Sequence, residues 1–160
     1  MSIIVAGTIL EKDGKVLLVK ENQNKDKGKW WIPAGGVDNG ELIEEAAIRE
    51  TYEESGYTVK ISGILCIYNK VLSDGKPVIG IIYKAQIING ELHFDPEEIA
   101  EAKWFSYDEI ISVKDELRNE SPILKCIEML KNGNILPLDI ILETGKPYSL
   151  IKNHKTENER

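Results

Sequence analysis

The sequence predicts an α+β fold in which helices cover a mixed β-sheet. Strand-like and helix-like runs are interleaved along the chain, and most of the strand-like runs join through tight turns. Such turns favour this arrangement over a doubly wound parallel sheet, in which helices would connect the strands. The chain has 160 residues, of which 42% are hydrophobic. That is the size of one domain, large enough to bury a core without disulfide bonds.

A hairpin and a short strand are expected near the start of the chain. Apolar runs at 3–10 and 15–21 flank Asp13-Gly14, and Asp-Gly between two such runs is typical of a hairpin turn. A polar loop then leads into a short strand at 30–33. Paired glycines follow this strand, which indicates backbone that bends or passes close to another group.

A long helix is expected at residues 39–55. Asp38 and Glu41 have the spacing of a capping box at its start. Gly56 suits the position just after its last turn, where the backbone adopts the left-handed conformation.

The remainder of the chain is expected to hold further strands, two helices and an extended tail. The expected elements are strands at 57–71, 77–89, 91–94 and 102–105, a short helix at 107–111, a closing helix from Ser121 to Gly133, and extended chain at 134–151. We therefore expect one domain over 1–133. A C-terminal extension over 134–160 would pack on that domain or form a dimer contact, with its last residues frayed.

Composition limits the partners and the compartment. The formal net charge of −7 argues against non-specific binding of nucleic acid. The N-terminus lacks the basic region of a signal peptide, and no apolar stretch approaches the length that spans a membrane. Two cysteines give no disulfide framework. We expect a cytoplasmic protein, a monomer or a homodimer, whose partner is a small molecule rather than a membrane or a nucleic acid.

One face of the helix at 39–55 changes from apolar to acidic along its length. Residues at helical spacing share this face. They are Ile43, Ala46, Ala47, Glu50, Glu53 and Glu54. A run of acids is usually a solvated helix face, but a face that packs on a sheet should not carry three carboxylates without compensation.

A divalent cation would supply that compensation. Like charges on adjacent helical turns repel and raise one another's pKa. Hard cations prefer carboxylate oxygens, and Mg²⁺ commonly bridges protein carboxylates to the phosphates of a substrate. The three glutamates therefore make a candidate platform for one or more Mg²⁺ ions.

The segment at 35–57 resembles the Nudix box. The pattern of that family is G-x5-E-x7-R-E-U-x-E-E-x-G-U, in which U is a bulky apolar residue. Its fixed positions are filled here by Gly35, Glu41, Arg49, Glu50, Glu53, Glu54 and Gly56. The departures are mild, with Thr51 at the first U and Tyr57 at the last.

The flanking segments resemble the same family. Residues 30–36 are similar to the strand and turn that enter the box, with Ala34 where glycine is commoner. Residues 97–106 are similar to the segment that closes the family's domain. The similarity covers roughly 3–132 and implies the Nudix fold, a mixed sheet between helices with a loop-helix-loop that carries the metal site.

The resemblance implies the roles of the helical acids. Glu50, Glu53 and Glu54 would bind Mg²⁺, with Mn²⁺ as a substitute. One of the acids would also act as base on the attacking water, and Glu50 is our choice. Arg49 would orient a carboxylate through charge-assisted hydrogen bonds. The alternative role for Arg49 is a surface ion pair with Glu53 that has no part in the site.

Further metal ligands are expected outside the helix. The backbone carbonyl of Ala34 or Gly35 is one candidate, because a carbonyl can approach a cation where no side chain obstructs it. A fourth acid often comes from a later loop in this family, and Glu98 is our choice over Glu97 and Glu101. Each of these acids is otherwise simply solvated.

Three residues ahead of the box are candidates for substrate contact. Trp30 and Trp31 are able to stack on a nucleobase, although the alternating directions of a strand place at least one of them in the core. Lys29 is a candidate for phosphate contact, with solubility as the alternative role.

The resemblance implies Mg²⁺-dependent hydrolysis of a nucleoside diphosphate linked to another moiety. ADP-ribose hydrolases usually carry a proline about fifteen residues past the box, where this chain has Leu72. By elimination we expect a nucleoside triphosphate, normal or oxidised, giving a monophosphate and pyrophosphate. The alternatives are an ADP-ribose or other nucleotide-sugar pyrophosphatase, a nucleotide-binding module without catalysis, and removal of pyrophosphate from an RNA 5′ end.

Overall fold

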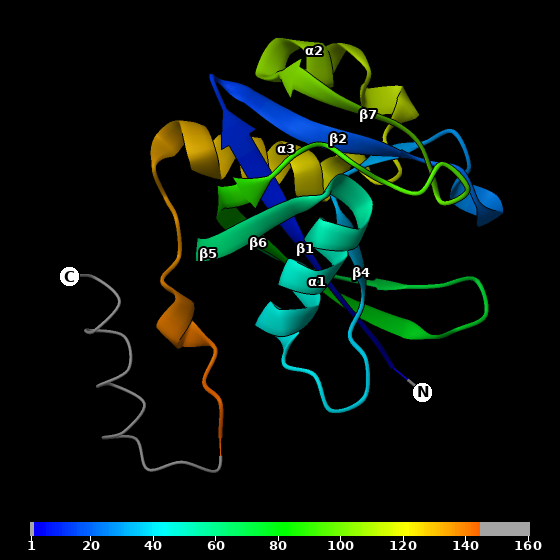
Figure 1. Cartoon of the computed structure of the whole chain (residues 1–160). Helices are drawn as coiled ribbons and strands as arrows, with labels where there is room; N and C mark the ends of the chain where they lie inside the picture. Colours follow the sequence, from blue (N-terminus) through cyan, green and yellow to red (C-terminus); the bar gives the residue numbers. More distant parts are fainter. Residues whose placement is uncertain (1, 145–160) are drawn as a thin grey trace.

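The computed structural model describes residues 2–144 (Figure 1). Its strands are β1 (Ile3–Lys12), β2 (Lys15–Glu21), β3 (Trp30–Trp31), β4 (Ala34–Gly36), β5 (Tyr57–Val71), β6 (Pro77–Gly90) and β7 (Ile99–Ser106). Its helices are α1 (Ile43–Ser55), α2 (Tyr107–Ser112) and α3 (Glu120–Asn132), joined by the short 3-10 turns η1 (Asn24–Asp26), η2 (Lys114–Glu116) and η3 (Leu138–Ile140). None of the described helices is long and apolar enough to cross a membrane.

The sheet is mixed and is built around β1. Most of β1 pairs in parallel with β6, from Ile3 opposite Val78 to Leu10 opposite Ala85. The other strand pairs are antiparallel, and the main path runs β3-β2-β1-β6-β5. Because hairpins and one parallel pair occur together, the predicted mixed α+β sheet is confirmed.

Helices cover both faces of this sheet, and each face has its own core. On one face α1 packs on β1 and β5 (Figure 1). The buried residues of this core include Ala6, Leu10, Ala46, Ala47, Ile81 and Tyr83. The core on the other face, which contains α3, includes Ile9, Leu65, Ile82, Cys126 and Ile127. Neighbouring strand residues such as Leu10 and Ile9 enter different cores because side chains alternate along a strand.

The helix that carries the acids begins later than predicted. Residues 39–42 lie outside it, and α1 starts at Ile43. Gly40 has a φ of +83°, which belongs to the left-handed region and not to a right-handed helix. The Asp38 amide donates to the Glu41 carboxylate at 3.0 Å, so the predicted contact forms in the preceding turn. The predicted stop is confirmed, because Gly56 caps the helix in the left-handed conformation.

The long hairpin of β5 and β6 also differs from prediction at its end. The strand predicted at 91–94 is wrong, because β6 runs on to Gly90 and a loop follows. Gly90 has a φ of +97° that breaks the extended backbone. The Gly56 carbonyl oxygen lies where a Gly90 side chain would begin, so this close approach also requires glycine.

The first part of the C-terminal segment lies against β5. The amide and carbonyl of Leu136 pair with those of Ile64 at 3.0 and 2.9 Å. The Ile135 side chain fills the space that a Gly63 side chain would need. The extended chain predicted over 134–151 is interrupted by η3, and its part from 145 onward lies outside the described residues. The division of the chain at 133 stays a prediction.

Thr51 departs from the apolar pattern of the box because it has a polar partner in the core. Its side chain is fully buried on α1, and its hydroxyl donates to the Ala47 carbonyl at 2.7 Å. The equally buried Thr8 hydroxyl of β1 lies 2.7 Å from the same oxygen. Since the Thr51 proton is used on Ala47, Thr8 is the donor in this pair. Both hydroxyls are thereby satisfied.

We predict strong coupling between these two threonines. Thr51→Val alone should cost about 1–3 kcal/mol, because it leaves the buried Thr8 hydroxyl without its acceptor, and Thr8→Val should cost less, because Thr51 still donates to Ala47. The double variant should cost clearly less than the sum, since it removes both polar groups and keeps their shape. Urea denaturation of the four proteins measures the coupling, and simple additivity would contradict it.

Candidate active site

The glycine turn and the acidic end of α1 meet across β1. Gly7 of β1 pairs with Ala34 of β4, and Ala6 pairs with Gly35. A side chain at Gly7 would collide with the Ala34 methyl group, 2.4 Å from the position of its Cβ. Gly7 therefore makes room for the alanine that replaces the commoner glycine, and β4 can lie close to β1.

Glu54 is a buried carboxylate held by the turn. It accepts a hydrogen bond from the Ala34 amide at 2.9 Å. Burial raises the pKa of Glu54 from 4.5 to about 8, since the amide offsets only part of the desolvation and the nearby Glu50 raises the pKa further. In the absence of a cation, an ionised Glu54 is therefore costly to this fold.

Glu50 lies against the bare backbone of Gly35. A side chain at Gly35 would begin only 2.2 to 2.4 Å from the carboxylate atoms of Glu50. The Glu50 side chain is 14% exposed, and this burial raises its pKa, although the Arg49 guanidinium opposes the shift. The glycine is needed here because of the close approach, which is a different reason from a turn conformation.

Arg49 is the hub that positions the acids. Its Nε and Nη2 donate to the two carboxylate oxygens of Glu41 at 2.8 and 2.9 Å, in the bidentate arrangement typical of arginine. The bond with Arg49 is the main reason why the pKa of Glu41 falls to about 2. Nη1 contacts Glu50 at 2.6 Å and Glu53 at 3.3 Å, and Nη2 donates to the Gly36 carbonyl at 3.0 Å.

The donors fit a hard divalent cation, although they do not already form a closed cage. Among residues 2–144, no three His, Cys, Asp or Glu side chains converge as a metal cluster. Arg49 holds Glu50 and Glu53, while Glu54 is turned to the Ala34 amide. Two buried carboxylates with raised pKa values, next to an uncovered glycine backbone, suit an oxygen-seeking cation.

The candidate fourth acid lies outside this group. Glu98 is exposed in the loop after β6, and its carbonyl accepts from the Asn22 amide at 2.9 Å. No contact places its carboxylate beside Glu50 or Glu54 within the described chain. Glu21, at the end of β2, is the acid that sequence reasoning missed, because it is close enough to raise the pKa of Glu54. Its only signal in the sequence was its position at the end of an apolar run.

The three predicted substrate contacts occupy different surroundings. Trp30 is 4% exposed and packs edge-on against Phe105, with ring centroids 4.9 Å apart, so its ring belongs to the core. Lys29 is turned away, since its Nζ donates to the Asp115 carbonyl at 3.0 Å. Trp31 lines a cavity.

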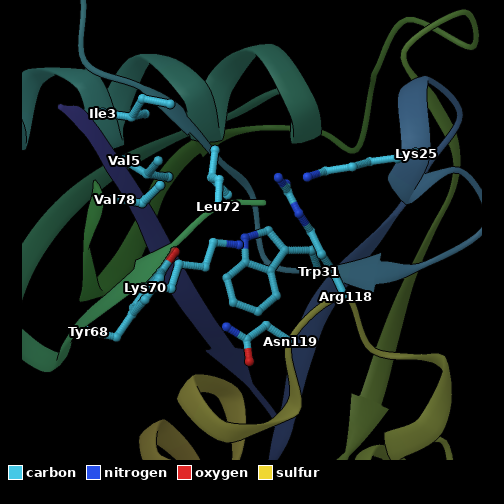
Figure 2. A pocket seen from close by; sticks show the side chains of 10 residues that line it. All are labelled: Ile3, Val5, Lys25, Trp31, Tyr68, Lys70, Leu72, Val78, Arg118 and Asn119. Atoms are coloured by element: carbon cyan, nitrogen blue, oxygen red, sulfur yellow. The ribbon is translucent and has the colours of Figure 1, made fainter. Parts of the chain in front are cut away.

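This cavity of about 160 Å³ is lined by side chains from β1, β3, β5 and β6, from η1 and from the segment before α3 (Figure 2). It is lined by Ile3, Val5, Lys25, Trp31, Tyr68, Lys70, Leu72, Val78, Arg118 and Asn119. Val5 pairs with Gly36, so the cavity lies next to the glycine turn on which the acids of α1 pack. Sequence reasoning missed Lys70 and Arg118, because they come from parts of the chain far from each other and from Lys25. A second, wider hollow opens at the other side, beside Tyr52 and Glu53.

Paired acids on a helix, packed against a glycine turn beside a cavity, define a site for cation-assisted chemistry on an anion. The NUDIX domain family model matches residues 2–125. With this match over well more than half of its length, the chain belongs to the Nudix family of hydrolases, which cleave pyrophosphate bonds in nucleotide derivatives.

Individual relatives agree with the family. Over 126 residues, 78% of this chain and 72% of the relative, the chain is 37% identical to an ADP-ribose pyrophosphatase of Methanocaldococcus jannaschii. It is 35% identical over 98 residues to a Bacillus subtilis protein provisionally named an 8-oxo-dGTP diphosphatase, covering 61% of this chain and 62% of that one. The structure of a NUDIX hydrolase from Nitrosomonas europaea matches with a TM-score of 0.77 and 30% identity, over 91% of this chain and 100% of that chain. The predicted Nudix fold is thus confirmed.

We predict that Glu54→Gln stabilises the metal-free protein at high pH. A carboxyl whose folded-state pKa is raised favours the unfolded state increasingly as the pH rises from 4.5 through about 8. Glutamine carries no charge and can still accept from the Ala34 amide. In EDTA, the Tm of the variant minus that of the wild type should therefore increase by roughly a few degrees as the pH is raised from 5 to 9. A pH-independent difference would contradict the prediction.

We predict that Gly35→Ala leaves the fold intact and lowers turnover at least about tenfold, because the new methyl group displaces the Glu50 carboxylate. Gly36→Ala is the matched control, since a side chain there meets no atom within 4 Å. Steady-state kinetics of both variants, with circular dichroism to establish folding, tests this difference. Equal activity of the two variants would be the contrary result.

Proposed function

We propose that this protein is a cytoplasmic, Mg²⁺-dependent pyrophosphohydrolase of nucleoside triphosphates, normal or oxidised. Its products would be a nucleoside monophosphate and pyrophosphate. The observation that carries the catalytic part is the pair of partly buried carboxylates at the glycine turn, with Glu50 against the bare Gly35 backbone and Glu54 on the Ala34 amide. Such costly burial without a permanent cationic partner for Glu54 is expected where a divalent cation completes the site.

The acids of α1 would divide the work. Glu50, Glu53 and Glu54 would hold the cation together with the carbonyl of Ala34 or Gly35. When bound, Mg²⁺ supplies charge neutralisation of the phosphates and a lower pKa for the attacking water. Glu50 would accept the proton of that water, and its raised pKa suits a base that must be neutralised during the reaction.

Arg49 would act as a positioning residue. In the present arrangement it contacts Glu50 and Glu53 from one guanidinium nitrogen, while its other two nitrogens remain anchored on Glu41. The strong pair with Glu41 fixes the guanidinium, so Arg49 can release one carboxylate oxygen to a cation without losing its place. Glu98 remains a proposed further ligand, which its loop would have to bring nearer.

The cavity supports a triphosphate as substrate. Trp31 contributes an aromatic ring to the lining, and Ile3, Val5 and Val78 give an apolar wall suited to a flat organic group. Lys25, Lys70 and Arg118 add positive charge where a chain of phosphates would arrive. The relative in Bacillus subtilis is named for a nucleoside triphosphate.

A specific observation also favours ADP-ribose as a second candidate. The Methanocaldococcus jannaschii relative is named for this substrate and shares the larger part of the chain. Against it stand Leu72, which occupies the place of the usual proline and lines the cavity, and the cations around it, which a neutral sugar does not need.

A substrate panel tests the proposal. Purified protein with Mg²⁺ would receive normal and oxidised nucleoside triphosphates, ADP-ribose and dinucleoside polyphosphates, with release of pyrophosphate or monophosphate as readout. We expect triphosphates to have the highest kcat/KM. Glu54→Gln should lower kcat about a hundredfold or more while folding normally.

The outcomes separate the candidates. If the protein prefers ADP-ribose, the second candidate substrate would replace the triphosphate, and the proposed roles of the catalytic residues would stand. Wild-type turnover by a folded Glu54→Gln variant would contradict its role as ligand. No turnover of any compound by a protein that binds Mg²⁺ would overturn the proposed activity. EDTA should abolish, and excess Mg²⁺ restore, any genuine hydrolysis.

A further inference from the structure

The cavity beside the acids concentrates positive charge in a protein that is otherwise acidic. Three cations line it, namely Lys25 of η1, Lys70 of β5 and Arg118 of the segment before α3. The whole chain carries a net charge of −7. Cations that lie close together repel one another, and an anion bound between them relieves this repulsion.

The cations of the cavity are close enough to affect one another. The pKa of Lys70 is lowered first by burial, then by the charge of Arg118 and further by that of Lys25. In Figure 2 the charged ends of Lys25 and Arg118 point toward one another. The Asp26 carboxylate neutralises part of this positive charge through an ion pair with Arg118 at 2.8 Å. Within residues 2–144, neither Lys25 nor Lys70 forms an ion pair.

The walls of the cavity are fixed before a ligand arrives. The Arg118 amide donates to the Trp30 carbonyl at 2.9 Å, which anchors the backbone of Arg118 to β3. Tyr68 lies over Gly80, where a side chain would collide with its ring. Its ring meets Trp31 edge-on at 6.3 Å. Because the Arg118 backbone and the aromatic wall are held in place, and the guanidinium is paired with Asp26, binding an anion here orders fewer groups.

Strand β1 places this cluster near the acidic end of α1. Val5, which lines the cavity, pairs with Gly36, next to the Gly35 backbone on which Glu50 lies. An anion held by Lys70 and Arg118 therefore lies in the cavity beside the glycine turn. It does not lie in a remote part of the molecule.

We infer that Lys70 and Arg118 are specificity-determining residues that bind a phosphate group of the substrate other than the two joined by the cleaved bond. This inference rests on the proposed function and narrows its substrate class to nucleotides with at least three phosphates, or with an equivalent additional phosphoryl group. A diphosphate linked to a neutral sugar has no further phosphate for Lys70 and Arg118 to bind. Leu72 and the apolar wall add no donor for sugar hydroxyls, and the neutral polar side chains that line the cavity are those of Tyr68 and Asn119.

ATP and ADP-ribose form a matched pair of probes. Both contain ADP, and they differ in whether the next group is a charged phosphate or a neutral sugar. Isothermal titration calorimetry in EDTA measures their binding without hydrolysis, and inorganic tripolyphosphate serves as a probe that lacks a base. The variants are Lys70→Gln and Arg118→Gln, with Arg118→Lys in case the loss of the Asp26 pair unfolds the protein. Lys27→Gln is the control, because this exposed lysine of the same loop lies outside the cavity.

We expect Lys70→Gln and Arg118→Gln each to weaken the binding of ATP and of tripolyphosphate about tenfold, as for the loss of one charged hydrogen bond. The affinity for ADP-ribose should change by less than about twofold. Lys27→Gln should change neither. Equal weakening of ATP and ADP-ribose, unchanged ATP binding in both variants, or no binding of ATP and tripolyphosphate to the wild type would each overturn the inference.

The same experiment separates this inference from the proposed function. A wild type that binds ATP through Lys70 but does not hydrolyse nucleotides with Mg²⁺ refutes the activity and leaves the phosphate site standing. If the wild type hydrolyses triphosphates, and the Lys70→Gln variant keeps the same preference for triphosphates over ADP-ribose, the activity is supported and the phosphate site is refuted.

Discussion

The structure depends most on the contact between the acidic end of α1 and the backbone of β4. Glu54 is held by one amide, and Glu50 lies where any side chain at Gly35 would collide with it. These carboxylates are desolvated, so the fold bears an electrostatic cost that its apolar cores must offset. The surrounding features reduce this cost or fix its geometry, from the Arg49 network to the close approach of β4 to Gly7.

Strand β1 connects the parts of the molecule that must act together. It pairs with β4, which presents the glycine turn, and with β6, which continues into the long hairpin. One face of β1 supports α1 through Ala6 and Leu10, while Ile3 and Val5 line the cavity. The acids and the cations thus lie on opposite sides of a single rigid strand, which keeps their spacing constant.

The sequence predicted those features that depend on local spacing. The stripe that places Glu50, Glu53 and Glu54 together follows from helical geometry, and the left-handed cap at Gly56 follows from residue type. The start of α1 was missed because the positive φ of Gly40 is not encoded in a spacing rule. Lys70 and Arg118 could not be found, since they meet each other and Lys25 only through the folding together of segments far apart in the chain.

Strand β5 forms the outer end of the main sheet path, and its pairing with Leu136 has a consequence for how the protein behaves in a crowded solution. An open strand edge offers unsatisfied amides and carbonyls to the edge of any other chain. By lying across Ile64, with Ile135 fitted over Gly63, the segment after α3 occupies the middle of that edge. The short segment therefore blocks pairing of this edge of β5 with another chain, although none of its side chains belongs to the group of catalytic acids.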